Sequence, residues 1–307
     1  MPLSIYTHQA CLQHEMGPHH PESPARLESI LLALKKQPWS SQLHWHNSPQ
    51  ASKEQLARAH SQKYIESIFS IAPSQGYVQL DADTMMNAAT LEAALHAAGA
   101  VVAAVDEILS GRVKRAFCAV RPPGHHAEPD FAMGFCFFNN IAIGVHHALS
   151  TYHLQRVAIV DFDVHHGNGT ESMFLAESKV CFWSSFQHPF YPGTNLTGKP
   201  AHIHLCPIPA GTSGHLFRQK VDLELIPLLE DFKPECIFIS AGFDAHVNDP
   251  LANIKLTAQD YEYVTNALCE IANKHSKSRV ISTLEGGYNL QALSESVVAH
   301  VQSLLNK

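Results

Sequence analysis

RVAIVDFDVHHGNGT, residues 156–170, joins a short apolar run to a cluster of polar residues. The run Val157–Val160 predicts a strand buried on both faces, as in a parallel sheet. Asp161, Asp163 and His165 follow at alternate positions, so on extended backbone they share one face. A carboxylate and an imidazole two residues apart suit a divalent metal ion of the zinc type. Taken alone, so short a pattern is more typical of a solvated surface turn.

Predicted strands and helices alternate along the whole chain. The predicted strands are 3–7, 115–120, 157–160, 180–184, 236–240 and 280–284, and the predicted helices are 24–37, 61–71, 87–109, 140–150, 169–176, 213–231, 257–274 and 290–305. Ser23 is a predicted cap before Pro24, and Pro227 a predicted kink. The alternation predicts an α/β fold with a largely parallel sheet and helices on both faces. No linker or repeat interrupts the pattern, so one domain over residues 1–307 is expected.

Composition narrows the functional classes. Hydrophobic residues make up 45% of the 307 residues and charged residues 16%, which predicts a globular chain with a large core. The formal net charge of −7 argues against a nucleic-acid partner. The seven cysteines are scattered, so we expect buried free thiols in a reducing compartment. The absence of a signal-peptide pattern in MPLSIYTHQA and of membrane-length apolar runs predicts a cytoplasmic protein without a membrane partner.

Polar residues follow two further predicted strands. Asp244 comes after the strand 236–240 and could be a third metal ligand, and three protein ligands with one open position are typical of a catalytic site. By itself Asp244 is more typical of a helix or turn cap. Tyr288 follows two glycines that permit its phenol to turn inward, where it could stabilise an oxyanion. A turn tyrosine is the ordinary alternative.

His125 and His126 follow a Pro-Pro-Gly turn and are candidates for acid and base catalysis near neutral pH. Asp161 and Asn168 flank the metal segment and are plausible partners for the two rings. An aspartate partner favours a cationic imidazolium, whereas a neutral asparagine leaves its histidine free to accept a proton.

Two loop aromatics, Phe135 and Tyr191, could form the apolar walls of a channel. Loop aromatics are more often packing residues, so this interpretation depends on the other motifs.

Six segments together resemble the zinc-dependent histone deacetylase and acetylpolyamine amidohydrolase family. They are HPESPARL (20–27), RPPGHHAEPDFAMGFCFFNN (121–140), DFDVHHGNGT (161–170), YPGT (191–194), SAGFDAHVNDPL (240–251) and LEGGYN (284–289). The resemblance extends from about His20 to Leu305. The form of the DFDVHHGNGT motif with Asn168 resembles the class II branch and its bacterial relatives. It implies an arginase-like α/β fold with an eight-stranded, mainly parallel sheet.

The resemblance also implies roles for individual residues. Asp163, His165 and Asp244 would bind one catalytic Zn²⁺; His125 and His126, backed by Asp161 and Asn168, would transfer protons; and Tyr288 would hold the scissile carbonyl. Gly134 would accept a hydrogen bond from the substrate amide between the walls Phe135 and Tyr191. Structural K⁺ would bind at Asp161, Asp163, His165, Ser184 and Ser185, with a second site on the main chain around Phe174, Glu177 and Val180. Phe186 departs from the family, whose members commonly carry a histidine at this position.

The predicted reaction is removal of acetyl or other acyl groups from N-acylated lysine side chains of peptides or proteins. Leu251 resembles the apolar gatekeeper of lysine deacetylases, where some polyamine-selective members carry a glutamate. A carboxylate from another loop or a partner subunit could replace that glutamate, and Glu15, Glu22 and Asp130 are candidates. A deacetylase of acetylpolyamines or other small N-acyl amines is therefore the alternative.

Two other classes stay open at this stage. A non-catalytic module that binds acylated ligands is less favoured. Degenerate members of such families usually lose a metal ligand or the tyrosine, and this sequence keeps them all. A dimanganese ureohydrolase would need additional Asp and His ligands. Oligomeric state is not predicted.

Overall fold

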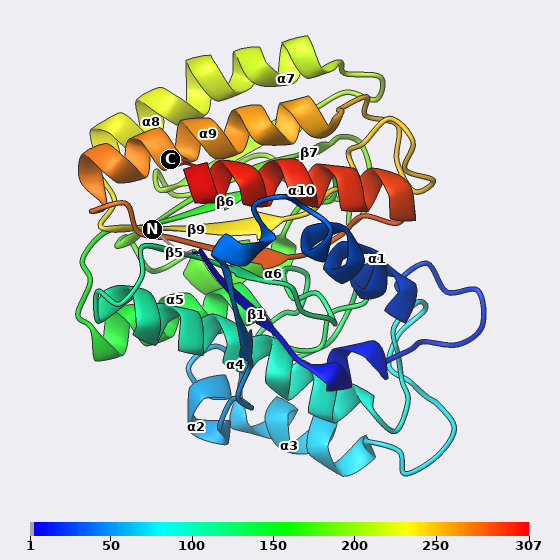
Figure 1. Cartoon of the computed structure of the whole chain (residues 1–307). Helices are drawn as coiled ribbons and strands as arrows, with labels where there is room; N and C mark the ends of the chain where they lie inside the picture. The colour runs from blue at the N-terminus through cyan, green and yellow to red at the C-terminus, as the bar shows by residue number, and fades with distance from the viewer. Residues whose placement is uncertain (1–2, 307) are drawn as a thin grey trace.

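An eight-stranded parallel sheet runs through the computed structural model, which describes residues 3–306 (Figure 1). The strand order is β2-β1-β5-β10-β9-β6-β7-β8. The strands are β1 (Leu3–Thr7), β2 (Leu43–Asn47), β5 (Arg115–Cys118), β6 (Val157–Asp161), β7 (Val180–Gln187), β8 (Ile203–Ile208), β9 (Cys236–Ala241) and β10 (Val280–Leu284). This confirms the predicted fold class. The predicted domain, 1–307, includes Met1, Pro2 and Lys307, which lie outside the described residues.

Helices cover both faces of the sheet (Figure 1). On one face lie α1 (Pro24–Lys35), α9 (Ala258–His275) and α10 (Leu290–Asn306), with α7 (Gly214–Lys220) and α8 (Ile226–Phe232) beyond them. On the other lie α4 (Thr90–Leu109) and α5 (Asn140–Thr151), with α2 (Lys53–Leu56) and α3 (Gln62–Ile71) outside them. The short α6 (Asn168–Phe174) follows β6, and β3 (Val78–Gln79) pairs antiparallel with β4 (Met85–Met86). Two 3₁₀ turns are formed by Gln9–Leu12 and Ser40–Gln42.

The interior strands form where apolar runs predict them. All residues of β6, β9 and β10 are buried, because helices cover both faces of the sheet. The two strands without a local signal, β2 and β8, lie at the edges of the sheet. In β2, LHWHN, only Leu43 is buried. In β8, Pro207 is tolerated because an edge strand has one side without ladder hydrogen bonds.

Three local details differ from the sequence-based expectation. Ser23 precedes α1, but its side chain makes no capping hydrogen bond. The fourth helix begins at Thr90, because Asn87 Oδ1 accepts hydrogen bonds from Ala89 N at 3.2 Å and Thr90 Oγ1 at 2.9 Å. Between α7 and α8 the chain forms a π-helical segment, Val221–Leu225. Pro227, which lacks an amide hydrogen, follows this segment, so the predicted irregularity is a π turn.

All seven cysteines lie among the described residues; they are buried and form no disulfide, as predicted. Among residues 3–306, no helix has both the length and the hydrophobicity needed to cross a bilayer.

A buried ion network ties the N-terminal loop to the sheet. Glu22, Arg26 and Arg121 are each 0% exposed, and Glu22 pairs with both guanidinium groups. Arg121 also donates to the main-chain oxygen of Cys11 at 2.7 Å. Burial favours the neutral acid, but Arg121, His14 and Arg26 hold the pKa of Glu22 well below its ordinary value. The network is therefore charged, and its two cations depend on one carboxylate.

We expect Glu22→Ala to lower the free energy of unfolding by about 3–5 kcal/mol, because two buried guanidinium groups lose their counter-charge. Urea unfolding followed by circular dichroism measures this. The control is Glu28→Ala, which removes an exposed glutamate from α1, the helix that follows Glu22, and should change stability by less than about 0.5 kcal/mol. Equal effects of the two substitutions would contradict the assigned role of the network.

Candidate active site

The predicted site residues meet at the carboxyl ends of neighbouring strands. Asp161 ends β6, and Asp163 and His165 follow it. Asp244 follows β9, and Tyr288 follows β10, the next strand in the sheet. Parallel strands bring their carboxyl ends to one edge, which is where α/β sheets bind ligands. Residues more than 120 positions apart in the chain are therefore neighbours here.

Three side chains form a group that could hold a metal ion. One ligand atom from each of Asp163, His165 and Asp244 lies within 4.8 Å of the others. His165 Nδ1 is 3.2 Å from Asp163 Oδ1 and 3.1 Å from Asp244 Oδ2. The aspartates are 1% and 0% exposed. Two buried carboxylates facing one imidazole nitrogen are a donor set suited to a divalent transition metal.

The carboxylates are held in place by main-chain amides. Gly286 N donates to Asp163 Oδ2 at 2.8 Å, and Val164 N donates to Asp244 Oδ1 at 2.8 Å. A side chain at Gly286 would collide with the carboxylates of Asp244 and Asp163, so glycine is required at this position. These contacts orient the carboxylates as outer hydrogen bonds commonly orient metal ligands.

The two carboxylates of the group are stabilised by a nearby cation. Burial, reinforced by the nearby charge of Asp163, raises the pKa of Asp244 to about 7. Burial alone would lower the pKa of His165, but Asp163 and Asp244 raise it to about 10. In the protein without metal, the His165 proton is thus held between the two carboxylates. A metal ion would compete with that proton for the same donors, so the residues fit a metal cofactor.

The two adjacent histidines have different partners. Their ring centroids lie 4.0 Å apart. His125 Nδ1 is 2.9 Å from Asp161 Oδ2, and His126 Nδ1 is 2.7 Å from Asn168 Oδ1. These are the pairs expected from the sequence.

Their charges differ accordingly. Burial opposes charge on His125, but Asp161 and Asp163 raise its pKa to about 10. Burial lowers the pKa of His126 well below its ordinary value, and the cations at His125 and His165 lower it further. Near neutral pH, His125 is a cation and His126 a neutral base.

A cavity of about 230 Å³ opens beside these groups. Its lining contains His126, His165 and Tyr288 together with the predicted substrate contacts Gly134, Phe135, Tyr191 and Leu251. The Phe135 ring lies 5.9 Å from the Tyr288 ring, and the Tyr191 ring 5.3 Å from that of His126. Burial raises the pKa of Tyr288 well above its ordinary value, so its hydroxyl keeps its proton.

Two residues of the cavity were missed in the sequence. Phe190 stacks on His165 with 5.5 Å between ring centroids, and Asp83 lines the same cavity. Asp83 lies in a turn in which Asp81 Oδ1 accepts a hydrogen bond from Thr84 N at 2.7 Å. The Asp-x-Asp-Thr pattern signals such a turn, but it gives no indication that the turn faces the cavity.

None of the three carboxylates considered from the sequence lines the cavity. Glu22 belongs to the buried ion network, Glu15 accepts a hydrogen bond from the Tyr77 hydroxyl at 2.6 Å, and Asp130 is exposed. Asp83 is the acidic residue at this place. Burial and the charge of Asp81 raise its pKa.

The residues implied for potassium occupy two places. Asp161 and Ser184 are register partners on β6 and β7, and Ser185 follows in β7. His166 Nδ1 lies 3.0 Å from Ser184 Oγ. Phe186, the departure noted above, is buried and packs 4.7 Å from the His166 ring, measured between ring centroids.

The second implied potassium segment closes the turn between α6 and β7. Glu177 N donates to the main-chain oxygen of Phe174 at 3.1 Å, and Val180 N donates to that of Glu177 at 3.0 Å.

Comparison with known proteins agrees with this arrangement. The family model described as "Histone deacetylase domain" matches residues 20–304. The chain is 36% identical to "Histone deacetylase 14, chloroplastic" of Arabidopsis thaliana, over 99% of this chain and 77% of that protein. It is 34% identical to a "Probable deacetylase" of Archaeoglobus fulgidus, over 95% of this chain and 82% of that protein.

The fold is also similar to that of a solved structure. The crystal structure of the HDA15 HD domain superposes with a TM-score of 0.90 at 31% identity, covering 99% of this chain and 90% of that one. The shared sheet, the metal-capable group at its edge and the match over residues 20–304 lead to one conclusion: the chain belongs to the histone deacetylase family of amidohydrolases.

Proposed function

We propose that the protein is a zinc-dependent amidohydrolase that removes acetyl or other acyl groups from N-acylated lysine side chains of peptides or proteins, with residues 1–307 acting as one catalytic domain. The observation that carries the proposal is the cavity itself. His126, His165 and Tyr288 line it together, so a proton acceptor, a metal ligand and a phenol reach one small volume. The combination suits hydrolysis of an amide at its carbonyl.

Asp163, His165 and Asp244 would hold the zinc ion. When bound, it would act as a Lewis acid on the acyl group and make water a stronger acid. His126, neutral and lining the cavity, accepts the proton of the attacking water. The Tyr288 hydroxyl donates a hydrogen bond to the acyl oxygen as negative charge develops there. The protonated His126 then gives its proton to the departing amine. Cationic His125 stabilises, by electrostatic attraction, the negative charge that develops on the acyl oxygen.

The walls of the cavity support a lysine-like substrate. Phe135, Tyr191 and Leu251 are apolar surfaces suited to the methylene chain of a lysine. Gly134 would accept a hydrogen bond from the amide N–H of the acylated group. The runner-up is a small N-acyl amine such as an acetylpolyamine, which Asp83 favours because it places a carboxylate in the same lining.

We also propose structural potassium at Asp161, Asp163, His165, Ser184 and Ser185, and at the main chain of Phe174, Glu177 and Val180. The buried carboxylate of Asp161 and its register partner Ser184 support the first site. A cytoplasmic location stays a prediction.

Loss of a metal ligand should abolish stoichiometric zinc. We expect Asp244→Ala to reduce zinc per chain at least about tenfold, because two remaining ligands cannot complete the site. Elemental analysis of the purified protein measures this, with Asp130→Ala, an exposed aspartate, as the control. Undiminished zinc in Asp244→Ala would contradict the ligand assignment.

Loss of the phenol should slow turnover of an acetyl-lysine peptide. We expect Tyr288→Phe to lower kcat about 10²- to 10³-fold with little change in KM, as for removal of one oxyanion donor. Steady-state kinetics measure it. Tyr77→Phe, which removes an exposed hydroxyl, should behave as wild type. Full turnover by Tyr288→Phe would show that the proposed role is wrong.

The substrate class can be tested by comparing an acetyl-lysine peptide, a longer-chain acyl-lysine peptide and N-acetylputrescine. We expect kcat/KM for the better peptide to exceed that for N-acetylputrescine at least about tenfold, because the apolar walls favour a lysine chain over a free ammonium. Asp83→Asn should then affect N-acetylputrescine most, since only that substrate carries a free cation near the cavity. A preference for N-acetylputrescine in the wild type would favour the runner-up.

A further inference from the structure

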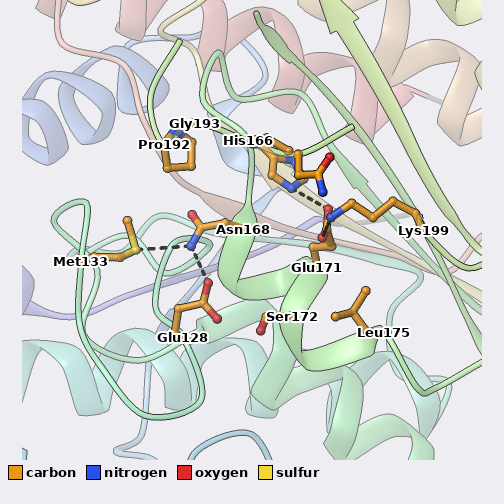
Figure 2. A pocket seen from close by; sticks show the side chains of 12 residues that line it. Glu128, Met133, His166, Asn168, Glu171, Ser172, Leu175, Pro192, Gly193 and Lys199 are labelled. Carbon is orange, nitrogen blue, oxygen red and sulfur yellow. Dashed lines mark hydrogen bonds and ion pairs between the residues drawn. The ribbon is translucent and has the colours of Figure 1, made fainter. Parts of the chain in front are cut away.

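Asn168 lies between the histidine pair and a second cavity of about 310 Å³ (Figure 2). Its Oδ1 is 2.7 Å from His126 Nδ1. On the other side, its Nδ2 donates to Glu128 Oε1 at 2.6 Å, and Met133 Sδ lies 3.3 Å away. Figure 2 shows Glu128 and Met133 both directed at the amide nitrogen of Asn168. The amide thus connects a carboxylate in one cavity to a histidine in the other.

The surroundings of Asn168 fix which way its amide points. An amide nitrogen only donates and an amide oxygen only accepts. Glu128 Oε1, Met133 Sδ and the main-chain oxygen of His126, 3.4 Å away, are all acceptors on the nitrogen side. Reversing the amide would place its oxygen against a carboxylate. The orientation with Oδ1 toward His126 is therefore the one that satisfies both sides.

This orientation decides which nitrogen of His126 carries the proton. Because Asn168 Oδ1 can only accept, His126 Nδ1 must donate, and Nε2 keeps its lone pair for the catalytic cavity. With the amide reversed, the Asn168 nitrogen would donate to Nδ1 and force the proton onto Nε2. The wrong tautomer of a catalytic histidine can cost up to about 10⁴-fold in kcat.

We propose that Glu128 is a positioning residue for the reaction: it holds the Asn168 amide in the orientation that keeps His126 as the Nδ1–H tautomer. The inference rests on the proposed function for its effect on rate, but the tautomer itself is a property of the protein.

Glu128 is built into the fold. Its main-chain N donates to the oxygen of Phe131 at 3.0 Å, and its main-chain oxygen is 3.0 Å from Nδ1 of the buried His60. His60 Nε2 accepts from Asn139 N at 2.9 Å, so His60 must donate through Nδ1. With its backbone anchored on both sides, Glu128 is a preorganised support for Asn168.

The kinetic test compares Glu128→Ala with Glu128→Gln. We expect Glu128→Ala to lower kcat on an acetyl-lysine peptide about 10- to 100-fold, with KM within twofold. The loss should be partial, because Met133 Sδ and the main-chain oxygen of His126 remain as weaker acceptors for the Asn168 amide. Glu128→Gln keeps an oxygen that can accept from Asn168 and should retain kcat within about threefold. Asn195→Ala, an exposed change in the same cavity, is the matched control.

A double variant separates positioning through Asn168 from any other role of Glu128. In an Asn168→Ala background, Glu128→Ala should have no further effect on kcat, because there is no amide left to orient. An equal loss in both backgrounds, or a Glu128→Ala variant with wild-type kcat, would overturn the proposal.

The tautomer can be measured without activity. Two-bond ¹⁵N–¹H spectra of histidine-labelled protein distinguish Nδ1–H from Nε2–H, and the signals absent from His126→Gln identify His126. We expect Nδ1–H in the wild type and in Glu128→Gln, and an Nε2–H population in Glu128→Ala. A pure Nδ1–H signal in Glu128→Ala would overturn the proposal. If the wild type failed to hydrolyse every substrate, the proposed function would fail while this spectrum still decided the role of Glu128.

Discussion

The site at the carboxyl edge of the sheet depends on two carboxylates that are buried side by side. Asp163 and Asp244 are almost fully shielded from water and face the same imidazole nitrogen. Burial of two such charges is unfavourable unless a cation and hydrogen-bond donors compensate them. Main-chain amides from two loops provide the donors, and the imidazolium provides the cation when no metal is bound. A divalent ion is the stronger compensation, which is why the geometry suits a metal centre.

The two adjacent histidines show how one neighbour changes the charge of a side chain. His125 and His126 are adjacent and both buried, yet the aspartate beside one and the asparagine beside the other separate their charges. For His126, the influence of the surroundings extends beyond its partner Asn168. Asn168 is useful to His126 only in one orientation, and the contact with Glu128 favours that orientation. The orientation of the Asn168 amide beside His126 is thus supported by a residue that lines a different cavity.

Elements with a local sequence pattern could be predicted, whereas elements that depend on contacts with a neighbour could not. Interior strands such as β6 and β10 were predicted closely, because burial on both faces requires a continuous apolar run. The edge strands β2 and β8 carry no such run, and pairing with a neighbour is what makes them strands. The metal-capable group and the partners of His125 and His126 were predicted from polar residues in the segments that come after predicted strands. Asp83 and Phe190 were missed because they lie in loops without a periodic pattern.

The sequence by itself determined the alternation of strands and helices, the polar residues at strand ends and, through six matching segments, the family. These are local properties, since each depends on residues close together in the chain. Only the tertiary structure decided where several other carboxylates lie. It paired Glu22 with Arg121 in a buried ion network, brought Asp83 into the cavity beside His126 and His165, and set Glu128 against Asn168. Asp83 lies between β3 and β4, outside the main sheet, and reaches the cavity only through the packing of the folded chain. Glu22 and Arg121, like Glu128 and Asn168, lie after different strands of the parallel sheet, so these pairs meet only when the sheet brings those segments to one edge.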